Sequence, residues 1–246
     1  TLQFMAAHRG LSTGAALERV GILELDTLGL PGSLLDGVEA SALACTADAL
    51  QAILPLRARN SHKGSNGHVL CIGGDHGGGG AVLLAAGAAL RCGAGLASVA
   101  TRGEHVPALL SRHPEVMVHA FAAGGDLQAL LARVDVVAIG PGLGQTAWGR
   151  GLFDAVNLLA QAPCMLQPGD VLTPHPGEAG RLLGCDAIDI QRDRLAAAKA
   201  LCARFGAQVV LKGAGTIIAS PGKPPVVIAA GNPGMAVGGM GDLLTG

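Results

Sequence analysis

The chain has 246 residues, of which 50% are hydrophobic and 2% aromatic, and its formal net charge is -1. This composition is typical of a globular protein with a sizeable core, and the balanced charge argues against nucleic acid or a membrane as the main partner. The stretches 76–90 and 224–241 lack Asp, Glu, Lys and Arg but contain too many glycines or prolines to span a bilayer. Six cysteines without metal-ligand spacing indicate reduced thiols, so we expect a cytoplasmic protein.

Short apolar segments alternate with Ala- and Leu-rich segments from residue 68 onwards. We expect strands at residues 68–72, 97–101, 116–120, 135–139, 208–211, 216–219 and 226–229. We expect helices at residues 46–54 (with Thr46 as N-cap), 80–92, 106–110, 126–133, 148–159, 178–183 and 189–205. Continuous apolar strands between helices predict a mostly parallel sheet covered on both faces, with ligands at the carboxyl ends of the strands.

The first sixty residues break this alternation. Residues 1–5 and 21–30 have strand and turn patterns, and residues 40–60 have those of a helix and a linker, so we place a domain boundary near residue 60. The sequence Gly-Leu-Ser-Thr-Gly at 10–14 matches the serine-hydrolase turn G-x-S-x-G. Arg9 precedes it where that turn needs a strand, and no helix pattern follows closely, so we reject that function.

The most informative motif is Gly-Gly-Met-Gly-Asp at residues 238–242, directly before a predicted helix that starts at Leu243. Closely spaced glycines expose backbone N–H groups, and such a run before a helix attracts anions. Asp242, directly behind them, can take a proton from a hydroxyl that receives a phosphoryl group. The structural alternative for Asp242 is a helix N-cap.

Two more glycine-rich loops follow predicted strands, at residues 73–81 and 140–144. The first also opens a helix, which suits phosphate binding, although a flexible turn is the alternative. The dinucleotide fingerprint G-x-G-x-x-G does not fit this loop, and the chain contains no P-loop G-x-x-x-x-G-K-[ST]. These two nucleotide-binding folds are therefore excluded.

Two motifs in the C-terminal half also suggest ligand contacts. His175 lies between Pro174 and Pro176, which stiffen its backbone, so we expect it to contact a ligand at the sheet edge. Lys-Gly-Ala-Gly-Thr at residues 212–216 joins two predicted strands and can hold the phosphate or ribose of a nucleotide. A plain turn with a solvated lysine is the alternative.

Together these motifs resemble the NAD(P)H-hydrate dehydratase family in order and spacing over about residues 60–246. The motifs that carry the resemblance lie at residues 61–64, 73–81, 140–144, 173–178, 212–216, 232–235 and 239–242. The resemblance implies a ribokinase-like three-layer α/β/α fold with a mostly parallel sheet. It also implies dehydration of the S form of hydrated NADH or NADPH with ADP, or ATP in some members: the hydroxyl of the hydrate is phosphorylated and phosphate is then eliminated, with release of AMP.

The resemblance also assigns ligands and residues. We expect ADP (or ATP) as co-substrate, Mg²⁺, an NAD(P)H hydrate as substrate, no protein side chains forming a metal site, no nucleic-acid or membrane partner, and a homo-oligomer (tetramer or larger). The implied contacts to the hydrate are Ala81, Gly142, Gly144, His175 and Asp242. The implied contacts to ADP are Lys212, Gly213, Ala214, Gly215, Thr216 and Gly241. Asp242 as the base, with Gly239 and Gly241 stabilising the transferring phosphoryl group, is the implied catalytic set.

Residues 1–39 resemble the tail of an NAD(P)H-hydrate epimerase domain, with residues 40–60 as linker and residues 61–246 as the dehydratase domain. The parent protein is then bifunctional, and residues 1–5 should pair within a separate sheet. The dehydratase domain is expected to be incomplete at its C-terminal end and near residues 156–157, where the family has a strand that ends Asp-Ala-Asp. We expect a break in the chain between Val156 and Asn157.

Two other functions stay open. A small-molecule kinase for a vitamin or sugar has the same fold and the same Gly-Gly-x-Gly-Asp chemistry. A non-catalytic dinucleotide-binding module is the third possibility, against which the intact Asp242 argues.

Overall fold

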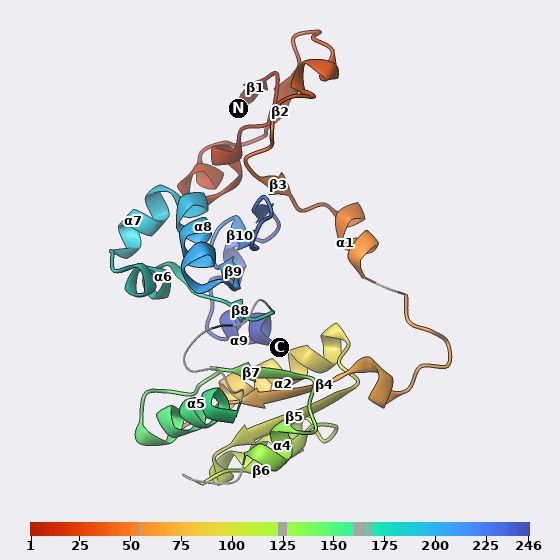
Figure 1. The fold of residues 1–246 in the computed structure, drawn as a ribbon, viewed down its shortest axis with the longest axis vertical. Helices are drawn as coiled ribbons and strands as arrows, with labels where there is room; N and C mark the ends of the chain where they lie inside the picture. The colour runs from red at the N-terminus through yellow and green to blue at the C-terminus, as the bar shows by residue number, and fades with distance from the viewer. Residues whose placement is uncertain (55, 123–126, 160–165, 167–168) are drawn as a thin grey trace. The chain divides into compact units, whose positions relative to one another are not determined.

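The computed structural model describes residues 1–54, 56–122, 127–159, 166 and 169–246. The chain divides into two compact units (Figure 1): Thr1–Pro55 with Met165–Pro233, and Leu56–Cys164 with Gly234–Gly246. Each unit has its own hydrophobic core. Within the described residues, no helix combines the length and the apolar character that crossing a membrane requires.

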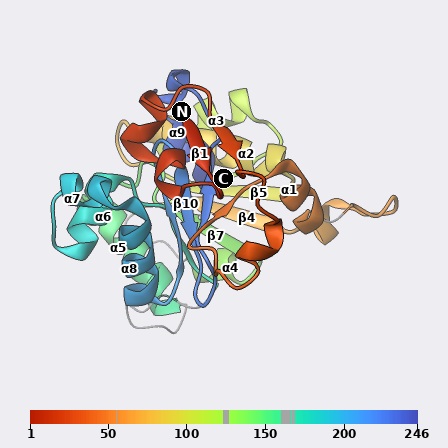
Figure 2. The same ribbon diagram turned by 90° about the horizontal axis from the view of Figure 1, so that it is seen from above.

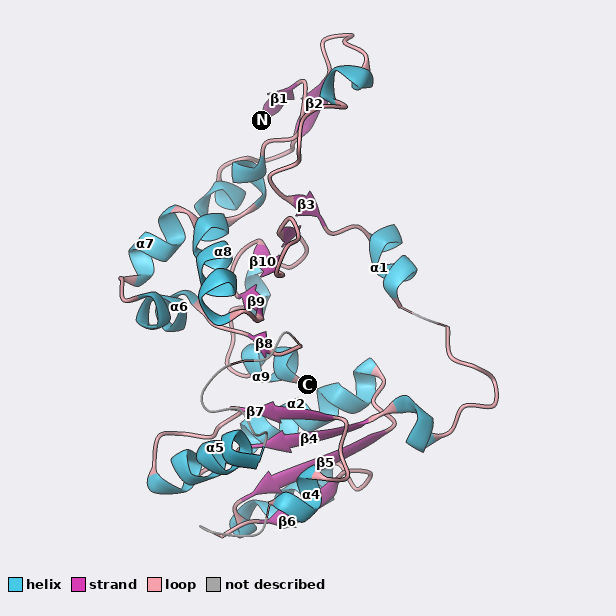
Figure 3. Cartoon of the chain, in the orientation of Figure 1, coloured by secondary structure: helices cyan, strands magenta, loops and turns pink. Residues whose placement is uncertain are grey.

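The unit Leu56–Cys164 with Gly234–Gly246 is built on a four-stranded parallel sheet. Its strand order is β6 (Met117–Ala120), β5 (Leu96–Thr101), β4 (His68–Ile72) and β7 (Val136–Ile139). All of its pairs are parallel, and the arrows of β7, β4 and β5 point the same way in Figure 3. In the central strand, Val69 pairs with Ala97 on one side and Val136 on the other. The carboxyl ends of these strands therefore lie along one edge.

Helices cover both faces of this sheet, which gives three layers. On one face, α2 (Gly79–Cys92) and α3 (Val106–Arg112) pack through Val82, Ala85 and Leu109. On the other face, α4 (Gln128–Leu131) and α5 (Ala147–Leu159) pack through Leu130, Trp148 and other apolar side chains. The last helix, α9 (Met240–Thr245), packs on α2. Short 3-10 turns occupy Lys63–Asn66 (η4) and Gly103–His105 (η5).

The other unit contains a mixed five-stranded sheet. Its order is β3 (Leu43–Ala44), β11 (Val226–Ile228), β10 (Thr216–Ala219), β9 (Gln208–Leu211) and β8 (Val171–Leu172). Strands β9, β10 and β11 are antiparallel, whereas β8 and β3 join in parallel at the two ends. Helix α8 (Arg194–Phe205) lies along β9 and β10 (Figure 2), and α6 (Pro176–Leu183) and α7 (Ala187–Arg192) pack beside it. A 3-10 turn, η6, spans Pro233–Met235.

The N-terminal residues form a small sheet of their own. Strand β1 (Leu2–Phe4) pairs in parallel with β2 (Glu24–Asp26), and 3-10 turns occupy Arg9–Ser12 (η1), Gly14–Glu18 (η2) and Gly32–Leu35 (η3). Thr46 caps α1 (Ala47–Ile53) by accepting a hydrogen bond from the Ala49 N–H at 3.2 Å, as predicted. Strand β3 falls inside the expected linker 40–60 and pairs with β11. The assignment of residues 1–39 and 40–60 stays a prediction.

Two expectations about helices were wrong. The helix expected at 189–205 is two helices, α7 and α8, because the Asp193 side chain accepts a hydrogen bond from the Ala196 N–H at 2.9 Å and so begins a new helix. The break expected between Val156 and Asn157 is absent, since α5 runs through both residues. Trp148, Leu152 and Val156 recur at every fourth position and pack in one core, which holds this segment as a single helix. Asp126 lies outside the described residues.

Candidate active site

The two glycine-rich loops after β4 and β7 lie against each other, backbone to backbone. The Gly74 N–H donates to the Pro141 oxygen at 2.9 Å, and the Asp75 N–H donates to the Gly142 oxygen at 2.7 Å. A Cβ atom on Gly142, whose φ is 61°, would lie 3.0 Å from the Gly78 Cα. Glycine is therefore required here, because a side chain would force the loops apart.

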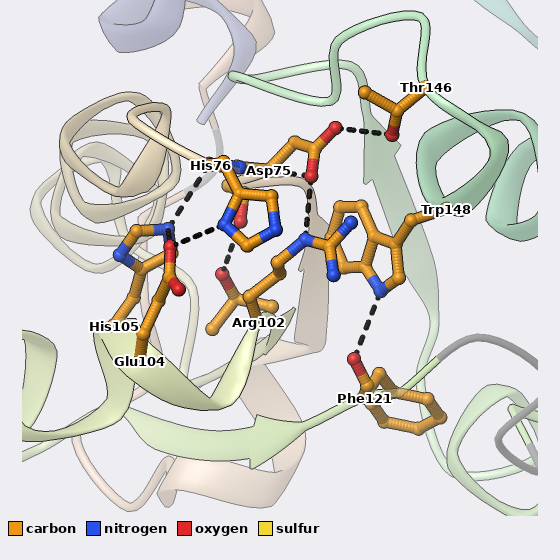
Figure 4. A network of polar contacts seen from close by, with 10 residues as sticks. Asp75, His76, Arg102, Glu104, His105, Phe121, Thr146 and Trp148 are labelled. Carbon is orange, nitrogen blue, oxygen red and sulfur yellow. Dashed lines mark hydrogen bonds and ion pairs between the residues drawn. The ribbon is translucent and has the colours of Figure 1, made fainter.

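A buried carboxylate, that of Asp75, connects these loops (Figure 4). Asp75 is 4% exposed and accepts hydrogen bonds from the Thr146 Oγ1 at 2.5 Å, the Arg102 Nε at 2.6 Å and the His76 N–H at 2.9 Å. A Cβ atom on Gly144, whose φ is 66°, would lie 3.1 Å from the Asp75 Oδ2, so a side chain there would be crowded and strained. The hydrogen bond from Thr146, together with those from Arg102 and His76, outweighs desolvation and lowers the pKa of Asp75 to about 2.

Arg102 extends this connection to a third strand end. Its guanidinium group lies 4.8 Å from the centre of the Trp148 ring, and the Trp148 Nε1 donates to the Phe121 oxygen at 2.9 Å. Residues that follow β4, β5, β6 and β7 are thus held together at one edge of the sheet. The sequence motifs did not include Asp75, Arg102, Thr146 or Trp148 as site residues. The sequence signal for Asp75 and Arg102 was their position, since each is a charged residue shortly after a predicted strand.

The rim of the same edge carries an exposed cluster. The His76 Nδ1 lies 2.9 Å from the Glu104 Oε1, and the His105 Nε2 lies 3.1 Å from the Asp75 carbonyl oxygen. The hydrogen bond from His76 is the main cause that lowers the pKa of Glu104. These contacts hold η5 beside the start of α2. The His105 ring lies so close that a Cβ atom on Gly79 would overlap it.

Asp242 is the third residue of α9 and follows Gly239, which has a φ of 91°. This left-handed conformation favours glycine, and a Cβ atom there would lie 2.6 Å from the Leu84 Cδ1 in α2. Helix α9 is therefore fixed on α2, whose third residue is Ala81. The predicted site residues in this unit are Ala81, Gly142, Gly144, Gly239, Gly241 and Asp242.

The remaining predicted residues belong to the other unit, where Glu178 connects them. His175 is the N-cap of α6: its Nδ1 accepts a hydrogen bond from the Gly177 N–H at 2.9 Å, and its own N–H donates to the Glu178 Oε2 at 2.7 Å. The Lys212 Nζ lies 3.7 Å from the same Glu178 oxygen. The structure therefore brings His175 and Lys212 together. The signal for Glu178 was its position three residues after the cap.

The turn 212–216 joins β9 to β10 and is supported from behind. Arg194, which is 3% exposed, donates through its guanidinium group to the Leu211 and Lys212 oxygens at 3.3 and 3.2 Å. The Thr216 Oγ1 donates to the Gly213 oxygen at 3.0 Å. Burial lowers the pKa of Arg194, but an arginine stays protonated in a protein. The sequence around Arg194 gave no signal of this role.

Side chains for a protein-held metal are not grouped in this structure. Across the described residues, no three His, Cys, Asp or Glu side chains gather as metal ligands. Mg²⁺ needs no such group when phosphate oxygens supply most of its ligands and the protein adds only one or two carboxylates.

Comparison with known proteins agrees with this geometry. The sequence model of a family described as NAD(P)H-hydrate dehydratase matches residues 69–169 and 153–246. The chain is 46% identical to the bifunctional NAD(P)H-hydrate repair enzyme Nnr of Coxiella burnetii and 46% identical to that of Escherichia coli. Both alignments cover all of this chain but only 53% and 50% of the relatives' sequences. The chain therefore spans about half the length of these relatives.

Solved structures give the same result. An ADP/ATP-dependent NAD(P)H-hydrate dehydratase from Bacillus subtilis, co-crystallised with ATP and Mg²⁺, superposes with a TM-score of 0.73 and 31% identity, covering 83% of this chain and 78% of that one. A ribokinase-like superfamily protein from Enterococcus faecalis matches with the same TM-score of 0.73 and 31% identity, over the same shares of the two chains. The ribokinase-like fold expected from the sequence is confirmed. Given these matches and the loops described above, the chain belongs to the NAD(P)H-hydrate dehydratase family.

Proposed function

We propose that this chain dehydrates the S form of hydrated NADH or NADPH with ADP as co-substrate, as part of a bifunctional repair enzyme. Family membership and the names of the relatives support this function. The observation that carries it is the pair of interlocked glycine loops at the carboxyl ends of β4 and β7, in the same unit as the run Gly239–Asp242. Ligands of parallel sheets bind at this end of the strands.

The start of α2 supplies donors for the phosphates of the hydrate. Helix α2 is fourteen residues long, and Gly78 before it has no side chain that could cap the first turn. The N–H groups at such a helix start attract a phosphate or pyrophosphate. Ala81, Gly142 and Gly144 would then contact the dinucleotide, and His175 stays a proposed contact to the hydrate.

Asp242 would accept the proton of the hydrate's hydroxyl while that oxygen bonds to the terminal phosphorus of ADP. The bond from this phosphorus to the bridging oxygen breaks, and AMP leaves. Backbone N–H groups at Gly239 and Gly241 would stabilise charge on the transferring phosphoryl group. The carbon–oxygen bond of the hydrate then breaks, phosphate departs with that oxygen, and loss of a ring proton restores the reduced nicotinamide. Mg²⁺ would travel with the phosphates and neutralise charge on them.

The decisive experiment incubates the complete protein with purified S hydrate of NADH or NADPH, ADP and Mg²⁺. Return of the absorbance of reduced nicotinamide, together with one AMP and one phosphate per turnover, is expected. A phosphorylated product that accumulates without reduced nicotinamide would instead identify a small-molecule kinase. ADP and hydrate binding without turnover would identify a non-catalytic module. Parallel reactions with ATP measure the preference between the two nucleotides.

The wider properties of the parent protein are also proposals. Residues 1–39 would be the tail of an epimerase domain, residues 40–60 a linker and residues 61–246 the dehydratase domain, in agreement with relatives about twice as long. Epimerisation of the R hydrate by the full-length protein tests this assignment. Light scattering tests the expected homo-oligomer, and cell fractionation tests the cytoplasmic location.

A further inference from the structure

The 3-10 turns near the N-terminus bind directly to the turn 212–216 within one unit. The Gly14 N–H donates to the Ala214 oxygen at 2.9 Å, and the Thr13 Oγ1 donates to the Gly215 oxygen at 2.7 Å. The Arg194 Nε in turn donates to the Thr13 Oγ1 at 3.0 Å. Residues that the sequence assigns to a different domain therefore contact the predicted ADP-binding turn.

Hydrogen bonds fix the direction of three carbonyl groups in the turn. The Lys212 oxygen accepts from Arg194, and the Gly213 oxygen accepts from Thr216. The Ala214 oxygen accepts from the Gly14 N–H and, at 3.2 Å, from the Thr13 Oγ1. In a trans peptide unit the N–H points opposite to the C=O, so each of these bonds also fixes the direction of the next residue's N–H. Fixed carbonyls at 212, 213 and 214 thus orient the N–H groups of Gly213, Ala214 and Gly215.

Those three N–H groups donate to no acceptor in the described parts of the chain. Adjacent backbone donors without a protein acceptor are the kind of group that holds a phosphate. Protein atoms lie close to two glycines of the turn. A Cβ atom on Gly215 would lie 2.6 Å from the Thr13 Cα, and one on Gly213 would lie 2.9 Å from an Arg194 guanidinium nitrogen. Protein atoms therefore occupy the Cβ positions of these two glycines.

We propose that Thr13, Gly14 and Arg194 are positioning residues that aim the N–H groups of the turn 212–216 at a phosphate of the adenine nucleotide. This inference rests on the proposed function, because that function supplies the nucleotide. It adds that the N-terminal segment completes the nucleotide half of the site. Binding of the nucleotide and docking of residues 12–14 onto the turn 212–216 are then coupled.

The charge of Arg194 favours the same ligand. Each hydrogen bond that the structure describes for its guanidinium group ends on an uncharged oxygen, in Thr13, Gln191, Leu211 or Lys212. Its positive charge is therefore not neutralised by a bonded carboxylate, and a buried charge is screened less than an exposed one. Arg194 adds a positive potential directly behind donors that face an anion.

The test compares ADP affinity in the complete protein by calorimetry for Thr13→Val and Arg194→Lys. Thr13→Val keeps the shape but removes the hydroxyl, so ADP affinity should fall at least about fivefold, the lower end of typical coupling between two sites. The KM for the hydrate should stay unchanged. Thr27→Val, in the same N-terminal region, and Arg192→Gln, an exposed neighbour, are the matched controls and should bind ADP as the wild type does. Unchanged ADP affinity in a folded Thr13→Val protein overturns the inference.

Hydrogen exchange gives a second measurement that does not depend on activity. Because coupling is reciprocal, docking of residues 12–14 that favours ADP binding is itself favoured by bound ADP, so ADP should slow exchange of the Gly14 N–H. No added protection at Gly14 would contradict the coupling even if Arg194→Lys failed to fold. A wild-type protein that binds ADP with this protection but dehydrates no hydrate would refute the proposed function alone. One that binds no ADP would refute both.

Discussion

Asp75 offers the sharpest test of how the glycine loops are held. Substituting Asp75→Asn keeps the size of the side chain but removes its negative charge. In the wild type, the carboxylate oxygens accept hydrogen bonds from Arg102, Thr146 and the His76 N–H. The amide has one acceptor oxygen, and its NH₂ group cannot accept from the Arg102 Nε. We therefore expect the loops after β4, β5 and β7 to lose stability together.

The pKa of Asp75 sets the size of this loss. The folded structure lowers its pKa from 3.8 to about 2. One pKa unit corresponds to about 1.4 kcal/mol, so the ionised carboxylate contributes about 2 kcal/mol to the free energy of unfolding at neutral pH. A lowered pKa gives stability that is present above the unfolded value of 3.8 and is lost as the pH falls towards 2. About half of the contribution should be gone at about pH 3.

Urea unfolding followed by fluorescence measures this directly, since Trp148 is the only tryptophan and stacks on Arg102. The difference between wild type and Asp75→Asn should be about 2 kcal/mol at pH 7 and about 1 kcal/mol at pH 3. Asp154→Asn, an exposed substitution on α5, is the matched control and should change stability by less than about 0.5 kcal/mol. A difference below about 0.5 kcal/mol at pH 7, or one that does not shrink on acidification, would refute the reasoning.

Three further outcomes are expected. Asp242→Asn should lower turnover at least about 100-fold with ADP binding retained, and near wild-type turnover in a steady-state assay would remove it from the chemistry. Lys212→Ala should weaken ADP binding more than hydrate binding in calorimetric titrations, and equal losses would make it a structural residue. Gly142→Ala should lower the free energy of unfolding by about 2 kcal/mol in urea, because Gly78 occupies the space that the new Cβ atom needs. Gly80→Ala, at a position with open space around the Cβ atom, is the control and should be neutral.

Local signals predicted most of the secondary structure. The strands at 208–211 and 216–219 have the bounds expected from their apolar runs, and α2 begins one residue before the expected position. The misjudged helices show where such signals end. Asp193 caps a new helix directly before the Leu- and Ala-rich run that starts at Leu195, and the sequence analysis did not use this cap signal. The break expected at Val156 came from comparison with a family pattern, which says what is missing from a chain but not how the remaining residues fold.

The site residues that the sequence missed depend on contacts between distant segments. Asp75 and Thr146 are 71 positions apart, and Thr13 and Gly215 are 202 apart, so no motif window contains either pair. The glycine-rich motifs also show what a sequence alone does not determine. Their spacing correctly marked places where backbones come close, but Gly142 and Gly215 exclude a side chain because protein atoms already occupy that space. A glycine-rich turn can thus be required on one face by packing and used on the other face by a ligand, and only the structure separates the two faces.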